Sequence, residues 1–187
     1  MIEKLKAHLE SQFPETKSLL NQTLIPSSVI VLIIKIDHIY KILLNKRTNN
    51  VHDHKGEISF PGGRQDKEDL DLKSTALREF EEEMGISHTK IDIIGSLSDV
   101  VTSSNYLITP YVATAYSKLN FSPNPKEVDL IIEIPINELM KQENLRSEVR
   151  VTNNEPLKYT CYSYRGNFIW GATARILTEL LTMIERE

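Results

Sequence analysis

The chain has 187 residues, of which 40% are hydrophobic and 26% charged, and its net charge is −4 at pH 7. This size and composition fit one globular domain with a sizeable core rather than two full domains. The negative balance argues against a general nucleic-acid binder and against a protein of anionic membrane surfaces, because both depend on clustered Lys and Arg.

Cysteine content and hydropathy limit where the protein can act. Cys161 is the single cysteine, which excludes an internal disulfide and a multi-cysteine zinc site and suits a reducing compartment. The N-terminal stretch has a charge every few residues and lacks the apolar region of a signal peptide. The most apolar run, residues 29–34, is too short to span a bilayer. We therefore expect a cytoplasmic protein.

The first 60 residues predict one helix followed by strands. Apolar side chains recur at three-to-four spacing from residue 2 to about residue 20, which predicts an amphipathic helix within an extension over residues 1–25. Pro26 and the pair Ser27-Ser28 predict a break in regular structure. Two runs rich in apolar residues, 29–36 and 39–44, flank Asp37-His38 and predict a β-hairpin. A short strand is expected over residues 57–60.

Between the hairpin and this short strand, residues 46–56 are polar and irregular. Basic side chains in and near this segment are candidates for charge-assisted hydrogen bonds to phosphate; they are Lys46, Arg47, His52, His54, Lys55 and Arg64. The alternative is a solvated loop with incidental basic residues. The two histidines could also be metal ligands, although nearby carboxylates make a better site for a hard cation.

The stretch 59–86 couples a tight turn to an acidic helix. Gly62 and Gly63 allow the backbone to turn and to approach a ligand closely, since glycine has no Cβ. A helix is expected to begin between residues 72 and 75, with Asp71 or Ser74 as its N-cap, and to end at Gly85. It is about three turns long.

The four glutamates of this helix fall into two groups. Because each residue adds about 100° of rotation, Glu79, Glu82 and Glu83 share one arc, while Glu81 points to solvent. An apolar stripe on another side faces the core; it comprises Ala76, Leu77, Phe80 and Met84. Three carboxylates on one arc suit a hard divalent cation such as Mg²⁺. The alternative is a solvated acidic face.

The remaining chain predicts further strands and one long helix. Strands are expected at 91–97, at 108–115, at 130–134 and, as a hairpin, at 159–164 and 168–170. Pro110 should place the second of these strands at a sheet edge or a bulge. A turn is expected at 102–105, a loop at 121–129, a short helix at 137–140 and a final helix from residue 171 onward. Cys161 should be buried in a strand.

Residues 78–86, REFEEEMGI, resemble the core of the Nudix box, in which Arg-Glu, Glu-Glu and Gly stand at fixed positions between apolar residues. Every specified position of this half matches. In the other half, Gly63 stands fifteen residues before Arg78 rather than fourteen, and Leu70 occupies the place of a family glutamate. Asp69, six residues after Gly63, makes this longer loop similar to the coenzyme A pyrophosphatase branch of the family.

The segment before the box resembles an extra signature of that branch. It keeps the branch's paired leucines, an arginine, a glycine and Phe-Pro-Gly-Gly; here these are Leu43-Leu44, Arg47, Gly56 and residues 60–63. It departs at Asn45, Thr48 and His52, where the branch usually has Thr, Ser or Ala, and Arg. Glu127 corresponds to an Asn-Pro-any-Glu-Val stretch of the branch, and residues 169–175 resemble its C-terminal region.

The resemblance implies an α/β protein with the Nudix fold, a mixed β-sheet sandwiched between α-helices (α/β/α), as a single domain over residues 1–187. It implies hydrolysis of a diphosphate in a nucleotide-like substrate. Glu79, Glu82 and Glu83 would hold Mg²⁺ or Mn²⁺, and Glu82, for preference, or Glu127 would be the general base. Further site residues would be Arg78 in the catalytic set, and Arg47, Lys55, Arg64, Gly62 and Gly63 around the substrate.

Coenzyme A or acyl-CoA would then yield 4′-phosphopantetheine, or its acyl form, and adenosine 3′,5′-bisphosphate. Two alternatives stay open: a Nudix enzyme acting on ADP-ribose or another nucleoside diphosphate derivative, and a non-catalytic sensor of coenzyme A or nucleotides. An isomerase of isoprenoid diphosphates is disfavoured, because Cys161 lies far from any motif that would recruit it.

Overall fold

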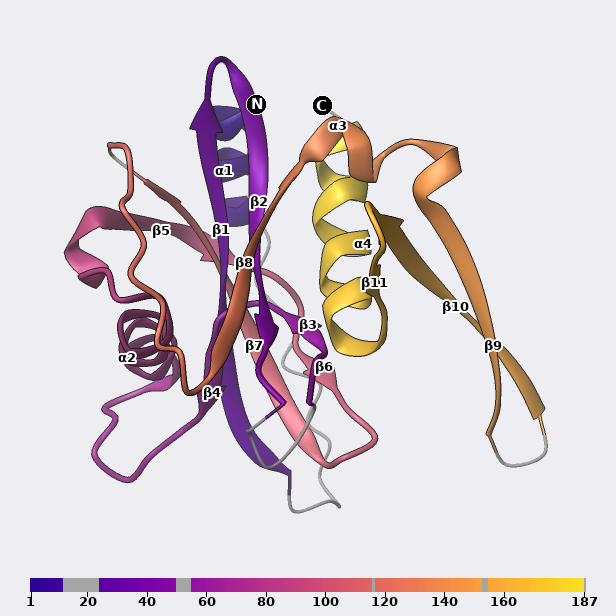
Figure 1. The fold of residues 1–187 in the computed structure, drawn as a ribbon, viewed down its shortest axis with the longest axis horizontal. Helices are drawn as coiled ribbons and strands as arrows, with labels where there is room; N and C mark the ends of the chain where they lie inside the picture. Colours follow the sequence, from indigo (N-terminus) through magenta and orange to yellow (C-terminus); the bar gives the residue numbers. More distant parts are fainter. Residues whose placement is uncertain (12–23, 50–54, 116, 153–154, 187) are drawn as a thin grey trace.

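The computed structural model describes residues 1–11, 24–49, 55–115, 117–152 and 155–186. A mixed sheet forms the middle layer, with α2 (Leu72–Met84) on one side and α4 (Gly171–Glu185) on the other (Figure 1). The helix α1 (Ile2–Ser11) packs on the α4 side through Leu5 and Leu9, which are buried in the same cluster as α4. The predicted α/β/α arrangement is therefore confirmed.

The main sheet is built around β1 and β7, which run parallel to each other. Its strands are β1 (Ile25–Ile36), β2 (Ile39–Arg47), β3 (Ile58–Ser59), β4 (Gly62–Arg64), β5 (Ile91–Ser96), β6 (Val100–Val101), β7 (Tyr106–Ala115) and β8 (Val128–Pro135). The first half of β1 pairs with β4 and its second half with β2. The predicted tight turn at Gly62 and Gly63 is therefore wrong, because both residues belong to β4, which pairs with β1 and contacts α2.

A second, antiparallel sheet follows β8. It contains β9 (Leu145–Thr152), β10 (Glu155–Tyr164) and β11 (Asn167–Ile169), and it is reached through α3 (Ile136–Leu139) and a 3₁₀ turn at Gln142–Asn144. Another 3₁₀ turn, His88–Lys90, links α2 to β5. Figure 1 shows the β9–β10 ladder extending away from the main sheet. The strand β9 was missing from the sequence prediction.

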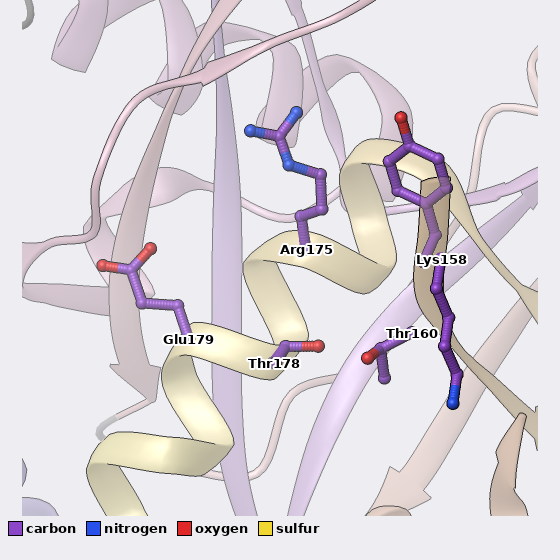
Figure 2. Close-up of a pocket in the computed structure, with 6 residues that line it drawn as sticks. Lys158, Thr160, Arg175, Thr178 and Glu179 are labelled. Carbon is purple, nitrogen blue, oxygen red and sulfur yellow. The ribbon is translucent and has the colours of Figure 1, made fainter. Parts of the chain in front are cut away.

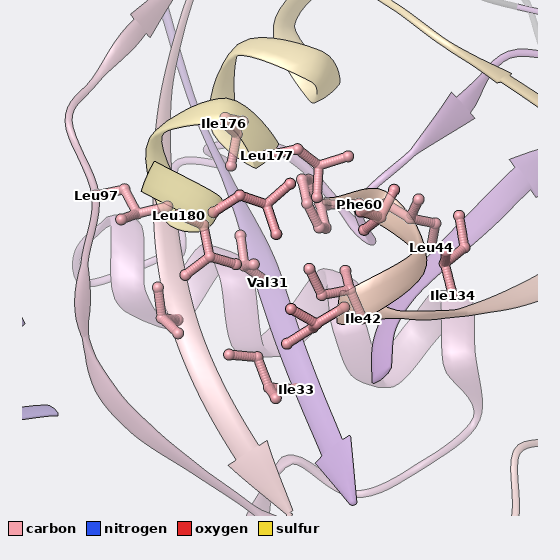
Figure 3. Packing of buried hydrophobic residues seen from close by; sticks show 14 of the residues in the cluster. Val31, Ile33, Ile42, Leu44, Phe60, Leu97, Ile134, Ile176, Leu177 and Leu180 are labelled. Carbon is pink, nitrogen blue, oxygen red and sulfur yellow. The ribbon is translucent and has the colours of Figure 1, made fainter. Parts of the chain in front are cut away.

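The centre of β1 is buried on both faces, which explains its continuous run of apolar residues. Ile30, Leu32 and Ile34 pack with α2. The intervening side chains face α1 and α4, where Val31 and Ile33 join Leu177 and Leu180 of α4 (Figure 3). No helix in the described part of the chain is long and apolar enough to cross a membrane.

The helix α2 begins and ends as its sequence predicts. Asp71 is the N-cap and forms a capping box with Ser74. Gly85 closes the helix in the left-handed region at φ 64°, a conformation that glycine adopts without steric cost. Its apolar stripe is confirmed, since Phe80 and Met84 are fully buried. Cys161 is also buried, as expected.

The predicted break at Pro26 and the predicted sheet edge at Pro110 are wrong, whereas the bulge given as the alternative for Pro110 has a counterpart nearby, where the β5–β7 register shifts between Ile93 and Gly95. Pro26 does not break the chain, because β1 begins at Ile25 and Pro26 pairs with Leu107 of β7. Pro110 does not mark a sheet edge, because β7 lies between β1 and the strands β5 and β6. On the latter side, Pro110 lies where the partner changes from β6 to β5, so the ladder needs no regular N–H donor there.

The predicted N-terminal helix is confirmed over Ile2–Ser11. The rest of that prediction, up to residue 20, falls outside the described residues. The turn at Asp37-His38 is confirmed, and both residues have positive φ angles of 47° and 66°, as a type I′ hairpin turn requires.

Candidate functional site

Glu83 is the buried carboxylate of the acidic helix. It is 1% exposed, and its Oε2 accepts hydrogen bonds from Asn45 Nδ2 at 2.8 Å and from the backbone N–H of Gly62 at 3.2 Å. Its Oε1 lies 3.5 Å from Arg47 Nη1. Burial raises the pKa of Glu83 to about 7, although the Arg47 charge and the Gly62 N–H oppose this shift.

Arg78 organises the other charges at this end of the sheet. Its Nε and Nη2 donate to the two oxygens of Asp69, each at 2.9 Å, in a bidentate pair. Its Nη1 donates to Glu79 at 2.8 Å and lies 3.4 Å from Glu82, and its Nη2 also reaches the carbonyl oxygen of Arg64 at 3.3 Å. Arg78 therefore positions its neighbours, and Asp69 is its bidentate partner.

These contacts perturb both partners of the pair. The hydrogen bonds from Arg78 hold the pKa of Asp69 far below its usual range, and the same contacts raise the pKa of Arg78. Thr75 supports Asp69 with a further hydrogen bond from its hydroxyl at 2.9 Å. Both charges of the pair are thus fixed at neutral pH.

Gly63 provides the space that Glu79 occupies. A Cβ added at Gly63 would lie 2.4–2.6 Å from the carboxylate atoms of Glu79, which is far inside van der Waals contact. Burial raises the pKa of Glu79, while the hydrogen bond and charge of Arg78 oppose the shift. The absence of a Cβ at Gly63 therefore lets the Glu79 carboxylate lie against the backbone.

The loop before β8 brings a fourth carboxylate to the site. The backbone N–H of Asn124 donates to the carbonyl oxygen of Glu83 at 2.9 Å, and Thr48 at the end of β2 donates to the carbonyl oxygen of Glu127 at 2.9 Å. Asn124 Nδ2 also donates to Glu127 Oε1 at 3.0 Å. The negative charge of Glu127 contributes to the raised pKa values of Glu79 and Glu83, so Glu127 lies within their electrostatic reach.

The arc predicted for α2 runs from the core to solvent. The side chain of Glu83 is 2% exposed, that of Glu79 17% and that of Glu82 56%. Glu81 is on the far side, where it bonds His88 Nδ1 at 2.6 Å, as the rotation of the helix predicts. Three carboxylates therefore follow one line from a fixed, buried position to a freely hydrated one.

A separate cavity of about 400 Å³ lies between β10 and α4 (Figure 2). Two of its charged side chains are engaged in structural contacts, because Arg175 donates to the carbonyl oxygen of Val101 at 2.8 Å and Glu179 accepts two hydrogen bonds from Ser98. None of the residues predicted for the functional site lines this cavity. The chemistry is therefore to be sought on the α2 face.

Comparison with known proteins identifies the family to which the chain belongs. The sequence matches the NUDIX domain family over residues 25–153. The chain belongs to the Nudix family. It is 33% identical over 144 residues to a protein of Photorhabdus laumondii named "Uncharacterized Nudix hydrolase NudL", covering 77% of each chain.

Solved Nudix structures share the fold at low sequence identity. The Nudix hydrolase RenU from M. smegmatis has a TM-score of 0.52 and 18% identity, with 61% of this chain and 72% of RenU covered. The NUDIX domain of Shewanella oneidensis NrtR, crystallised with ADP ribose, has a TM-score of 0.50 and 20% identity, covering 72% and 84%. These structures show the shared fold. The family match and the NudL relative identify this chain as a Nudix hydrolase, and enzymes of this family are pyrophosphohydrolases that generally use divalent metal ions.

The Nudix glutamates offer oxygen ligands for such an ion. Within the described ranges, no three acidic, histidine or cysteine side chains already lie close enough together to surround one. This arrangement still fits a hard cation such as Mg²⁺, which commonly keeps several waters and binds through one or two carboxylates together with substrate phosphates. Burial and, to a smaller extent, neighbouring carboxylates raise the pKa values of Glu79 and Glu83, so a cation bound beside them would favour their ionised forms.

The predicted substrate residues divide into two groups. Arg47, Gly62 and Gly63 contact or border the box glutamates. The side chains of Lys55 and Arg64 are exposed, and among the described residues neither contacts an α2 glutamate. His52 and His54 lie outside the described residues.

Two polar residues of the Nudix site were not predicted as functional. Asn45 contacts Glu83 directly, and Ser59 Oγ donates to Asn45 Oδ1 at 2.8 Å. The alternation of β2 was an available signal, because Leu43, Asn45 and Arg47 share the face that carries α2. A polar side chain between two inward positions of a buried strand indicates a specific buried partner.

Proposed function

We propose that this Nudix hydrolase cleaves the diphosphate of coenzyme A or acyl-CoA, releasing adenosine 3′,5′-bisphosphate and 4′-phosphopantetheine or its acyl form. One observation carries the proposal. The two segments that resemble the coenzyme A branch, around residues 43–48 and 60–63, meet at Glu83 through Arg47 and Gly62, both of which the branch signature specifies. A cytoplasmic location, which fits the single cysteine, would suit this substrate.

Glu79, Glu82 and Glu83 are assigned to hold Mg²⁺ or Mn²⁺. Such an ion would neutralise negative charge on the diphosphate and would make the attacking water a better nucleophile. Glu83 offers Oε1, because its Oε2 is occupied by two hydrogen bonds. Glu79 offers Oε2, since its Oε1 accepts from Arg78, and Glu82 offers a largely exposed carboxylate.

The reaction is the addition of water across one phosphoanhydride bond. The water oxygen bonds to one phosphorus, the bond from that phosphorus to the bridging oxygen breaks, and the departing phosphate keeps the electron pair. The water proton passes to a carboxylate, for which Glu82 is preferred because it is exposed and can return the proton to solvent. Glu127 is the other candidate for this base.

Arg47 is the best-supported contact to the substrate diphosphate. Its Nε is buried without a hydrogen-bond partner among the described residues, and its Nη1 makes only the 3.5 Å contact to Glu83. A phosphate oxygen would satisfy this donor, and charge-assisted bonds to phosphate are strong. Arg64 and Lys55 are assigned to the outer, solvated part of the substrate, and Gly62 and Gly63 to close backbone approach.

Product analysis tests the proposal directly. In three parallel reactions, the protein and Mg²⁺ are incubated with coenzyme A, with ADP-ribose or with NADH in ¹⁸O-labelled water. The products of each reaction are identified by mass spectrometry. We expect coenzyme A to give the highest kcat/KM and one ¹⁸O atom in one of the two products. Chelation of the metal should abolish the reaction.

Two outcomes would contradict the assignment. A higher kcat/KM for ADP-ribose would move the substrate to the class seen bound to the related NUDIX domain. Binding of coenzyme A without hydrolysis of any compound would support a non-catalytic sensor instead.

A further inference from the structure

A buried chain of hydrogen bonds connects two strands of the sheet to the metal-binding helix. Asn45 on β2 is fully buried, and it lies directly opposite Ser59 on β3. Ser59 Oγ donates to Asn45 Oδ1 at 2.8 Å, and Asn45 Nδ2 donates to Glu83 Oε2 at 2.8 Å. One amide thus receives a hydrogen bond from the sheet and passes one to the helix.

These hydrogen bonds give the two carboxylate oxygens of Glu83 different surroundings. Oε2 accepts from Asn45 and from the Gly62 N–H, whereas among the described residues Oε1 meets only the long contact from Arg47. If the Asn45 amide were reversed, its oxygen would face the Glu83 carboxylate. The bond from Ser59 to Oδ1 agrees with the orientation in which the NH₂ group faces Glu83.

We propose that Asn45, oriented by Ser59, is a positioning residue that fixes Oε2 of Glu83, so that Oε1 would be the atom that binds a divalent ion. This inference rests on the proposed function, because it assigns Glu83 as a ligand. Mutation of a residue that orients a metal ligand typically costs about 10- to 100-fold in metal affinity or activity.

The surroundings of Asn45 argue that the amide serves Glu83 rather than packing. Leu43, two residues earlier on the same face, belongs to the apolar cluster under α2, and Ile131 lies directly opposite Asn45 on β8 and packs against that cluster. A leucine would fill such a position without burying a polar group. The amide is compensated there by its bonds to Ser59 and Glu83.

Binding of Mn²⁺ without substrate tests the inference. Wild type, Asn45→Leu, Ser59→Ala and Ser59→Thr are titrated with Mn²⁺ by calorimetry, after circular dichroism has confirmed that each is folded. We expect Asn45→Leu to weaken the affinity by about 10- to 100-fold. The Ser59→Ala variant should show a smaller loss, and Ser59→Thr, which keeps the hydroxyl, should restore most of it.

Ser27→Ala is the matched control. Ser27 is also buried, and its hydroxyl donates to a backbone carbonyl, that of Leu107, at 3.1 Å, but it does not join the chain to Glu83. This variant should bind Mn²⁺ as wild type does. In activity assays, the loss in Asn45→Leu should shrink as Mn²⁺ is raised, which a defect of packing alone would not produce.

The outcomes separate this inference from the proposed function. If wild type binds Mn²⁺ and hydrolyses substrate, but folded Asn45→Leu and Ser59→Ala bind Mn²⁺ equally well, the positioning role is overturned and the function stands. If Asn45→Leu does not fold, Ser59→Ala against Ser59→Thr decides. If wild type neither binds Mn²⁺ nor hydrolyses a diphosphate, the proposed function fails and this inference with it.

Discussion

The two faces of the main sheet bury different kinds of side chains. The face under α1 and α4 is a large apolar cluster, in which Val31, Leu177 and Leu180 are fully buried (Figure 3). The face under α2 has a smaller apolar cluster, and buried polar groups such as Asn45 and Glu83 lie at its end. The difference indicates that one face supplies stability and the other supplies chemistry.

The α2 face must also offset its own repulsion. The clustered carboxylates would destabilise an isolated helix, since like charges one turn apart repel. Arg78 offsets this by bonding Asp69 and Glu79 and by approaching Glu82. The buried Glu83 carboxylate is stabilised instead by hydrogen bonds that residues on strands of the sheet donate to it. The polar face is therefore stabilised by specific pairs, while the apolar face depends on packed volume.

The largest effect on chemistry should come from Glu83→Gln. The change keeps the size of the side chain but removes the charge assigned to the metal, so turnover should fall on the order of a thousandfold or more. Steady-state assays at saturating Mg²⁺ measure this, and the unfolding free energy should change little. Glu81→Gln, on the exposed side of the same helix, should keep full activity. A Glu83→Gln enzyme with near wild-type turnover would remove Glu83 from the ligand set.

The largest effect on stability should come from the other face. Leu180 is fully buried in the α4 cluster, so Leu180→Ala should lower the unfolding free energy by about 2–5 kcal/mol through lost burial and a cavity. Urea denaturation measures the loss, and kcat of the folded fraction should be nearly unchanged. Leu70→Ala is the control, because Leu70 is 95% exposed. If Leu180→Ala also lowered kcat of the folded protein substantially, the apolar face would contribute to catalysis as well as to stability.

A smaller effect on the polar face is expected for Gly63→Ala. The added methyl would meet the Glu79 carboxylate, and that flexible side chain would have to move. Misplacing a catalytic group by about 1 Å can cost roughly a hundredfold in rate, so we expect a loss of that order in kcat. Thermal unfolding should shift little, because the displaced atoms are the end of a side chain. A large drop in stability with unchanged kcat per folded molecule would contradict this explanation.

Local features of the site could be predicted from the sequence because helix geometry is local. The capping at Asp71 and Gly85 and the separation of Glu81 from the other glutamates follow from residue spacing within α2. The burial of Glu83 does not, because its partner Asn45 is 38 positions away in the sequence. Partners at that distance are fixed by the pairing of β2 with the rest of the sheet.

The parts of the fold that the sequence did not predict also depend on partners that are distant in the sequence. Pro110 reads locally as an edge residue, yet β7 is central because partners on both sides come from distant segments. The strand β9 carries many charged residues and is held by β10 rather than by a strong local pattern. Asp69 could be recognised as acidic from the sequence, but its bidentate geometry with Arg78 depends on how the 65–71 loop folds back on α2.

The smallest effect concerns pH and the pair of Asp69 and Arg78. Arg78 holds the pKa of Asp69 far below its ordinary value of 3.8, so the ionised carboxylate stabilises the fold above about pH 4. That stabilisation is lost as pH falls from there toward the pKa of Asp69 in the folded state, because the unfolded chain then binds the proton more readily.

In Asp69→Asn this contribution is absent at every pH. The gap in unfolding free energy between wild type and Asp69→Asn should therefore be widest near neutral pH and narrow as pH falls below about 4. Urea denaturation at a series of pH values from 7 to 3 measures it. Asp66→Asn is the control, since Asp66 is largely exposed and lies 3.8 Å from Arg78 Nη2, so it should change stability little. A gap of constant size across the series would show that the paired charge of Asp69 does not stabilise this loop, and the polar face would then depend on Thr75 and Ser74 for its order.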